Sequence, residues 1–391
     1  MSRLQNIYRS LPAPVLRFVE PAKQAVDFLF HSRCDLWVLT GRERHGGEPF
    51  TVAYAGSDHF KNYVVGRVFA DGFQERFIGR PKLSRAFEQA RLYEPEIELF
   101  ACEVPLSVEK VFRPPAFATL PAWIQMDACL GADSGVWRTK KFSHAQKLIK
   151  AEGLTLEVTQ EPAQFEAFYL DLYLPYVRAR HETAAVVDSL EDAGIKFVKE
   201  GRELLLVRRD GVLLGGIVIG FAEGVERFWI LGVRTAEHGR VGAGAISDVL
   251  YYYAISRGRD RGCHTLNLGY CRSFVGDGLI RYKREWGARL VASRMPHSGG
   301  LALRFLKETD ALRSFLRNNP FVSMEATGRY HVNGFIEGSE TDGEDVAVLR
   351  SRYCTPGKLD VRLFAMMPKI VQWKERTRLP KGGEESLSRM Q

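Results

Sequence analysis

The sequence lacks long apolar runs, and this absence excludes a protein that crosses a membrane with helices. No run approaches the roughly 20 apolar residues that one crossing of a bilayer requires. Residues 1–10 also lack the apolar stretch that a secretory signal carries after its basic start. We therefore expect a cytoplasmic protein without a transmembrane segment.

Cysteine and histidine are sparse, and neither shows metal-ligand spacing. The 391 residues include six cysteines without any C-x-x-C pair, several of them in apolar stretches where a reduced thiol behaves as a small hydrophobe. The nine histidines include no H-E-x-x-H motif, and His31, His45 and His59 are interpreted as loop or surface residues. We expect no disulfide framework and no metal. The cysteines are Cys34, Cys102, Cys129, Cys263, Cys271 and Cys354.

Positive charge exceeds negative charge. The chain has 55 Lys and Arg residues against 47 Asp and Glu residues, with a net charge of +8 and a pI near 9.1. This excess favours a polyanionic partner such as nucleic acid, a phosphorylated cofactor or an anionic membrane surface. It is concentrated in residues 138–150 and 369–381. A solvated helix face and a frayed terminus are the alternative interpretations of these segments.

Length and composition predict a folded protein with room for two cores, and the order of its predicted helices and strands makes it α/β. Hydrophobic residues make up 45% of the chain and charged residues 26%. We expect a first domain at residues 1–130, a second at residues 131–310 and a C-terminal extension with a basic tail at residues 311–391. In the first domain, helices are predicted at residues 21–32 and 83–92, and strands at residues 35–40, 50–55, 96–104 and 124–129.

The second domain begins with a basic helix at residues 137–151. Its apolar residues recur at helical spacing, and we expect this helix to join the two halves as one rigid unit. Next come a predicted strand at residues 154–159, a long aromatic helix at residues 163–180 and a short helix at residues 189–193.

Three apolar runs then follow in residues 203–233. They are separated by Asp210-Gly211 and Glu223-Gly224, which are turn dipeptides of an antiparallel meander. A helix at residues 245–257 leads to a strand that ends at Leu268. This order predicts the crossover unit of a parallel strand pair.

A glycine-bearing loop connects the meander to the helix at residues 245–257. Gly239, Gly242 and Gly244 stand just ahead of the helix, where backbone N–H groups and the helix dipole suit a pyrophosphate. No Gly-Lys-Ser/Thr follows, which excludes a Walker loop, and the glycine spacing is not the Rossmann fingerprint. The alternative interpretation is a flexible connection.

The segment "NLGYCRSFVGDGLIRYKREWGARL", residues 267–290, places charged groups past the end of a buried strand. Such groups usually face the ligand-binding crevice of an α/β sheet. The alternative is structural: Trp286 fills the core, Gly287 permits a close approach, and Lys283 extends to water.

This order of elements resembles the GNAT acyltransferase fold, in which the glycine loop after the fourth strand holds the pyrophosphate of acyl-CoA. The segments "RTKKFSHAQKLIKAEGLTLEV", "FEAFYLDLYLPYVRAR" and "DGLIRYKREWG" further resemble the Fem-type branch, whose members form peptidoglycan bridges from aminoacyl-tRNA. They also resemble its CoA-using relatives, including acetyltransferases associated with cellulose biosynthesis. The resemblance covers residues 120–290 and implies two GNAT-like halves, each a mixed twisted sheet flanked by helices, with residues 20–130 as a degenerate first half.

The resemblance implies acyl-CoA, such as acetyl-CoA, as cosubstrate. The chain departs from the family at Gly239, where GNAT loops usually carry Gln or Arg. It also lacks the coiled-coil arm of some tRNA-using members, and the lack of this arm favours a CoA thioester. The implied cofactor-binding residues are Gly239, Arg240, Val241, Gly242, Ala243 and Gly244.

Acyl transfer to an amine needs a proton acceptor and a donor to the carbonyl oxygen. Asp277 is the candidate base, and Lys283 is a second catalytic candidate that holds an acidic substrate or steadies the thioester carbonyl. Backbone N–H groups on splayed strands are candidate donors. Arg272, Tyr270 and Tyr282 are candidate substrate-binding residues.

The sequence leads to three hypotheses. The first is an N-acyltransferase that moves an acyl group from acyl-CoA to an amine on a small-molecule, glycan or peptide precursor of the cell envelope. The second is an aminoacyl-tRNA-dependent transferase, in which the lysines of residues 140–150 and the basic tail contact tRNA. The third is a non-catalytic binding module with the same cleft.

Overall fold

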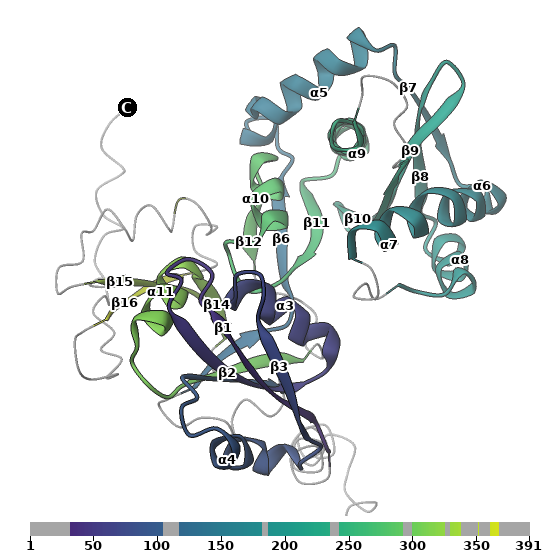
Figure 1. Cartoon of the computed structure of the whole chain (residues 1–391). Coiled ribbons are helices and arrows are strands. Elements are labelled where there is room, and N and C mark those ends of the chain that lie inside the picture. The colour runs from purple at the N-terminus through teal and green to yellow at the C-terminus, as the bar shows by residue number, and fades with distance from the viewer. Residues whose placement is uncertain are drawn as a thin grey trace, which may run out of the picture. The chain divides into compact units, whose positions relative to one another are not determined.

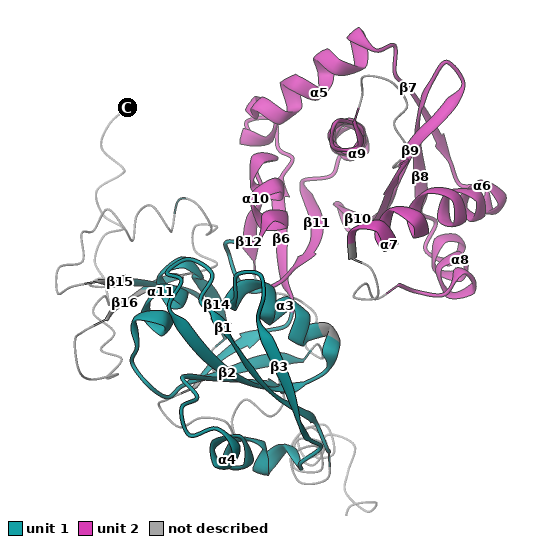
Figure 2. Cartoon of the chain, viewed as in Figure 1, with its two compact units in different colours: residues 1–122, 273–276, 295–391 teal, residues 123–272, 277–294 magenta. Residues whose placement is uncertain are grey.

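The computed structural model describes residues 32–104, 117–181, 187–234, 242–291, 299–324, 329–337, 351 and 360–366 (Figure 1). The chain divides into two compact units, which Figure 2 colours separately. Unit 1 consists of residues 1–122, 273–276 and 295–391, and unit 2 of residues 123–272 and 277–294. The chain therefore passes from unit 1 to unit 2 and back more than once.

Two segments from the sequence analysis cannot be followed in the structure. The basic segment at residues 369–381 lies outside the described residues, and so does the predicted helix at residues 21–32 except for its last residue. Among the helices within the described ranges, none is long and apolar enough to span a bilayer.

Unit 1 contains a six-stranded sheet with the order β3-β1-β2-β4-β13-β5. The β2/β4 pair is parallel, whereas β1 pairs antiparallel with β2 and β3, and β13 pairs antiparallel with β4 and β5. The strands are β1 (Asp35–Arg42), β2 (Pro49–Gly56), β3 (Gln74–Gly79), β4 (Leu99–Val104), β5 (Phe117–Pro121) and β13 (Gly300–Phe305). A three-stranded sheet adds β14 (Phe321–Met324), β15 (Tyr330–Glu337) and β16 (Asp360–Met366).

Helices cover both faces of the six-stranded sheet. Neighbouring side chains of β2 point to opposite faces, so Val52 joins a core with α3 (Asp58–Val68) and α11 (Asp310–Asn318), whereas Ala53 joins a core with α4 (Leu83–Tyr93). An N-cap residue with extended backbone precedes each of these helices, and the side chain of the N-cap Ser57 accepts the N–H of Phe60 at the start of α3.

Unit 2 contains a seven-stranded sheet with the order β12-β6-β11-β10-β9-β8-β7. The only parallel pair that its described strands form is β10/β11. The strands are β6 (Ile124–Cys129), β7 (Thr155–Thr159), β8 (Glu203–Arg209), β9 (Val212–Ala222), β10 (Val225–Val233), β11 (Thr265–Cys271) and β12 (Arg289–Val291).

The predicted meander is present as β8, β9 and β10. Asp210 and Gly211, with φ of 49° and 81°, form the first turn, and Glu223 and Gly224, with φ of 53° and 72°, form the second. Two consecutive left-handed residues give the hairpin turn that matches the right-handed twist of the flanking strands. The turn dipeptides therefore identified both hairpins correctly.

Helices also cover both faces of the unit 2 sheet (Figure 1). One core contains Leu205 and residues of α9 (Ala243–Asp260), and α5 (Lys140–Ala151) packs against α9 through Phe142, whose ring centroid lies 4.6 Å from that of Tyr252. The opposite core contains Leu206 with α6 (Pro162–Phe168) and α8 (Leu190–Lys199). The helix that we expected to join two halves is thus α5, which belongs to unit 2. Mixed sheets flanked by helices confirm the predicted α/β class.

The predicted aromatic helix is interrupted by one π-helical turn. Tyr169–Tyr173 forms this turn between α6 and α7 (Leu174–His181). It packs directly against β10 at Gly232, where an added Cβ would lie 2.6 Å from the backbone nitrogen of Tyr173. Only glycine allows the two backbones to approach this closely, so Gly232 sets the distance between the π turn and the sheet.

Substituting Gly232 by Ala tests this close approach. The added methyl group collides with backbone rather than with a flexible side chain. We expect the free energy of unfolding to fall by about 1–3 kcal/mol, the usual range for overpacking. The matched control is Gly220→Ala on β9, where the new Cβ would meet its nearest atom, Cγ of Arg202, at 3.6 Å, an ordinary contact. Equal stability of the two variants in urea unfolding would contradict the prediction.

Candidate functional site

A cavity of about 800 Å³ lies where β10 and β11 part. The two strands pair only from Val225 to Arg227 on β10 and from Thr265 to Asn267 on β11. Both strands continue past this point, and residues 228–231 and 268–270 line the cavity. The backbone groups on these facing edges are therefore not used in a ladder between β10 and β11.

Both strands are irregular at the level where they part. The register of β10 on β9 shifts between Phe228 and Ile230, and the register of β11 on β6 shifts between Asn267 and Tyr270. Gly269 has a left-handed φ of 77°, and its N–H donates to Oδ1 of Asn267 at 2.7 Å. Irregularities of this kind bend a strand and change the direction of its side chains, so they account for the opening.

Helix α9 forms another wall of the cavity. It begins after Gly242, and Gly244, Ser247, Asp248 and Tyr251 line the cavity. Gly242 provides no side-chain cap for the first N–H groups, and a Cβ on Gly242 or Gly244 would have no atom within 4 Å. The predicted cofactor residues Ala243 and Gly244 thus lie in the first turn of α9, whereas Gly239, Arg240 and Val241 lie outside the described residues.

The cavity contains a buried polar cluster centred on Asp248. Its side chain is only 7% exposed, and its two oxygens accept from Nζ of Lys141 at 3.0 and 2.8 Å. The hydroxyl of Tyr282 donates to the same carboxylate at 2.8 Å. Burial, followed by the influence of Tyr251 and Asp248, raises the pKa of Tyr282 above its ordinary value, which keeps this hydroxyl protonated.

Lys283 is held at the end of β11. It is 4% exposed, and its Nζ donates to the carbonyl oxygen of Tyr270 at 3.0 Å. The charge also acts on Cys271, whose thiol pKa is raised by burial and partly lowered by Lys283. The interpretation in which Lys283 extends to water is therefore wrong. Trp286, by contrast, is fully buried as that interpretation required.

The other candidates are placed as follows. Asp277 is the N-cap of α10 (Gly278–Glu285), and its Oδ1 accepts the N–H of Leu279 at 2.8 Å. Asp277, Tyr270, Tyr282 and Lys283 all line the cavity together with Gly244. Arg272 is not among the lining residues, and its guanidinium lies 3.9 Å from the ring centroid of Trp123.

Two cavity residues were missed by the sequence analysis. Asp248 and Lys141 are 107 positions apart and meet only because α5 packs on α9. An aspartate inside an otherwise apolar helix segment was a signal for Asp248. Lys141 stood in the basic segment and gave no separate signal. In the described part of the chain, no group of three or more His, Cys, Asp or Glu side chains is arranged to hold a metal ion.

No protein-family model matches the sequence, and no curated protein matches it. Solved structures with similarity include L-PGS from Bacillus licheniformis, at 12% identity over 74% of this chain and 89% of that chain, with a TM-score of 0.34. FemX gives 12% identity over 69% and 84%, with a TM-score of 0.35. A GCN5-related N-acetyltransferase from Sphaerobacter thermophilus gives 14% identity over 67% and 78%, with a TM-score of 0.31. Scores this low place the chain in none of these families.

The raised pKa of Tyr282 predicts a pH dependence of stability. The folded state holds the Tyr282 proton more tightly than the unfolded state, because burial disfavours the phenolate. This contribution to stability is complete below the ordinary tyrosine pKa of about 10 and is lost as the pH rises above it. Tyr282→Phe cannot ionise, so its free energy of unfolding should fall less steeply than that of the wild type between about pH 9 and 11.

The control for this titration is Tyr93→Phe, because Tyr93 is 54% exposed. Urea unfolding at each pH gives the slope for all three proteins. We expect the Tyr93 variant to keep the wild-type slope. The interpretation fails if Tyr282→Phe shows that same slope.

Proposed function

We propose that this chain is an acyltransferase that moves an acyl group from an acyl-CoA thioester to an amine in the cavity between β10 and β11. The observation that carries the proposal is the parting of two parallel strands beside the start of a helix, with a cavity of about 800 Å³ in the opening. The opening presents backbone donors, a helix N-terminus and titratable side chains to one space. Acyl transfer requires those groups together.

The donor is proposed to bind along α9 and β10. Its pyrophosphate would accept hydrogen bonds from backbone N–H groups in the first turn of α9, where Gly242 and Gly244 leave room for close approach. The predicted cofactor residues Gly239, Arg240 and Val241 precede this turn in the sequence. The thioester carbonyl would accept N–H groups from the edge of β10 beyond Arg227, where pairing with β11 has ended.

The reacting groups are proposed to come from α10 and the cluster around Asp248. Asp277 would accept the proton of the amine, because it lines the cavity. The leaving thiolate would take up a proton from solvent, and Tyr282, whose hydroxyl is held by Asp248 and Lys141, would line the space for the substrate. Lys283 would fix the end of β11 through the Tyr270 carbonyl and place a positive charge at this wall.

The acceptor is proposed to be an amine on a small-molecule, glycan or peptide precursor. One observation favours a second donor, aminoacyl-tRNA: Lys140, Lys147 and Lys150 are exposed on α5, whereas Lys141 turns to the cavity. A tRNA donor would show an affinity that falls steeply with salt. Tight CoA binding without any transfer would instead identify a binding module.

Substituting Gly242 by Leu tests the donor site. The backbone of Gly242 has φ of −71° and ψ of 162°, which any residue adopts, so the protein should fold. The new side chain would occupy the space proposed for the pyrophosphate. Calorimetry with acetyl-CoA should show an affinity at least about tenfold weaker, a loss of about 1.4 kcal/mol.

The matched control for the donor site is Gly135→Leu, an exposed position that does not line the cavity and has no atom within 4 Å of an added Cβ. It should bind acetyl-CoA as the wild type does. Unchanged affinity in Gly242→Leu, or a wild type that does not bind acetyl-CoA, overturns the proposed donor site. Binding of tRNA in place of acetyl-CoA would support the alternative donor.

Substituting Asp277 by Asn separates catalysis from helix capping. Asparagine caps a helix about as well as aspartate, so α10 should keep its start. A lost proton acceptor should lower turnover by about 100-fold or more while acetyl-CoA affinity stays nearly unchanged. The measurement is CoA release with primary amines as acceptors. Wild-type turnover in Asp277→Asn would show that Asp277 only caps α10.

A further inference from the structure

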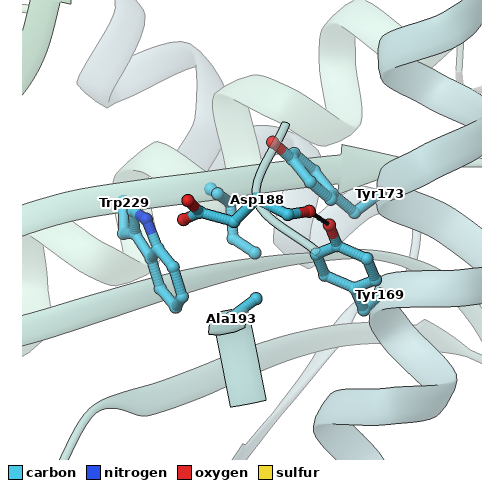
Figure 3. Close-up of a pocket in the computed structure, with 6 residues that line it drawn as sticks. Tyr169, Tyr173, Asp188, Ala193 and Trp229 are labelled. Atoms are coloured by element: carbon cyan, nitrogen blue, oxygen red, sulfur yellow. Dashed lines mark hydrogen bonds between the residues drawn. The ribbon is translucent and has the colours of Figure 1, made fainter. Parts of the chain in front are cut away.

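A second, smaller cavity adjoins the first within unit 2. Its volume is about 190 Å³, and Tyr173, Trp229 and Ile230 line both cavities. A water molecule takes about 30 Å³ of liquid volume, so the small cavity has room for a group of several heavy atoms. The lining residues, drawn in Figure 3, are Tyr169, Tyr173, Asp188, Ala193, Trp229 and Ile230.

The wall of the small cavity combines aromatic rings with one carboxylate. Tyr169, Tyr173 and Trp229 contribute the rings, and the Asp188 carboxylate points toward Trp229 (Figure 3). Aromatic rings attract cations through their electron-rich faces, and a nearby carboxylate supplies the counter-charge. We propose that the small cavity is a binding subsite for an organic ammonium group.

Cationic side chains of this protein already contact both the carboxylate and one of the rings. Nζ of Lys196 lies 2.9 and 2.8 Å from the Asp188 oxygens, and the Arg202 guanidinium lies 3.7 Å from the Trp229 ring centroid. The Lys196 and Asp188 side chains are 44% and 37% exposed, so their ion pair is screened by water and weak. A ligand ammonium can therefore share or replace Lys196 at Asp188 at low cost.

The subsite is held in place by the surrounding structure. The Tyr169 hydroxyl donates to the backbone carbonyl oxygen of Asp188, which fixes that residue against the π turn. Phe165 stacks on Trp229 with an interplanar angle of 6° and a centroid distance of 6.2 Å. Groups that are fixed before binding lose little entropy when a ligand arrives, which favours recognition.

The shared wall connects the subsite to the proposed reaction. If the large cavity is the site of acyl transfer, an ammonium in the small cavity belongs to the acceptor, and this step rests on the proposed function. The reacting amine must be neutral, whereas the subsite favours a charged one. The acceptor class is then a molecule with two amines, one of which stays charged.

Binding of choline and of its neutral counterpart 3,3-dimethylbutan-1-ol tests the subsite without any acyl donor. The two molecules have nearly the same shape and differ in charge. Broadening of their methyl NMR signals on titration with the full chain gives both affinities. We expect choline to bind at least about tenfold tighter, within the range of cation–π contacts with a counter-ion. Equal affinities overturn the subsite.

Variants assign the preference to named groups. Asp188→Asn should remove most of the preference for choline, and Lys196→Met should strengthen choline binding about threefold because it releases the carboxylate. Asp171→Asn is the charge control, because Asp171 is exposed on the π turn and does not line the cavity.

The outcomes separate the two proposals. The subsite is overturned if Asp171→Asn loses as much of the preference for choline as Asp188→Asn does. It is also overturned if Asp188→Asn keeps the wild-type preference. Both conclusions hold whether or not acetyl-CoA binds. If the choline preference depends on Asp188 but no amine accepts an acyl group, the subsite is supported and the proposed function fails. If both hold, diamines should be acylated at lower concentration than monoamines of the same length.

Discussion

The parting of β10 and β11 is the constraint on which the site of unit 2 depends. Parallel strands that stay paired leave no space between them, but here pairing stops after Arg227 and Asn267. The left-handed Gly269 and the register shift on β10 produce the separation. The π turn at Tyr169–Tyr173 packs on β10 through Gly232, and Tyr173 lines the cavity. The cavity thus follows from one break in a ladder, and the start of α9 and the aromatic side chains line it.

Charges buried beside this opening need partners from distant parts of the chain. A buried carboxylate or ammonium is costly unless it is paired and hydrogen-bonded. Asp248 is satisfied by Lys141 and Tyr282, and Lys283 is satisfied by the Tyr270 carbonyl. These contacts join α5, α9, α10 and β11 into one wall. Each of these contacts therefore positions a residue that lines the cavity and also holds one helix or strand against another.

Local sequence signals predicted much of the fold. The dipeptides at Asp210 and Glu223 gave the hairpins, and the strand at residues 124–129 agrees in its bounds with β6. Helix α10 was not predicted, because its eight residues are too short to show a clear period and its signal is the Asp277 cap. The meeting of Lys141 with Asp248 depends on packing across 107 positions, which no local pattern contains. The predicted roles of Asp277 and Lys283 stay proposals, although both line the cavity.

Hydrogen exchange with and without acetyl-CoA tests the central claim most directly, because the claim concerns backbone N–H groups. Amide N–H groups that donate no hydrogen bond to the neighbouring strand exchange readily, and a bound ligand protects them. We predict that acetyl-CoA slows exchange at residues 228–231 of β10 and in the first turn of α9, while the six-stranded sheet of unit 1 keeps its rates. Unchanged exchange at both segments, with acetyl-CoA bound, would contradict the account.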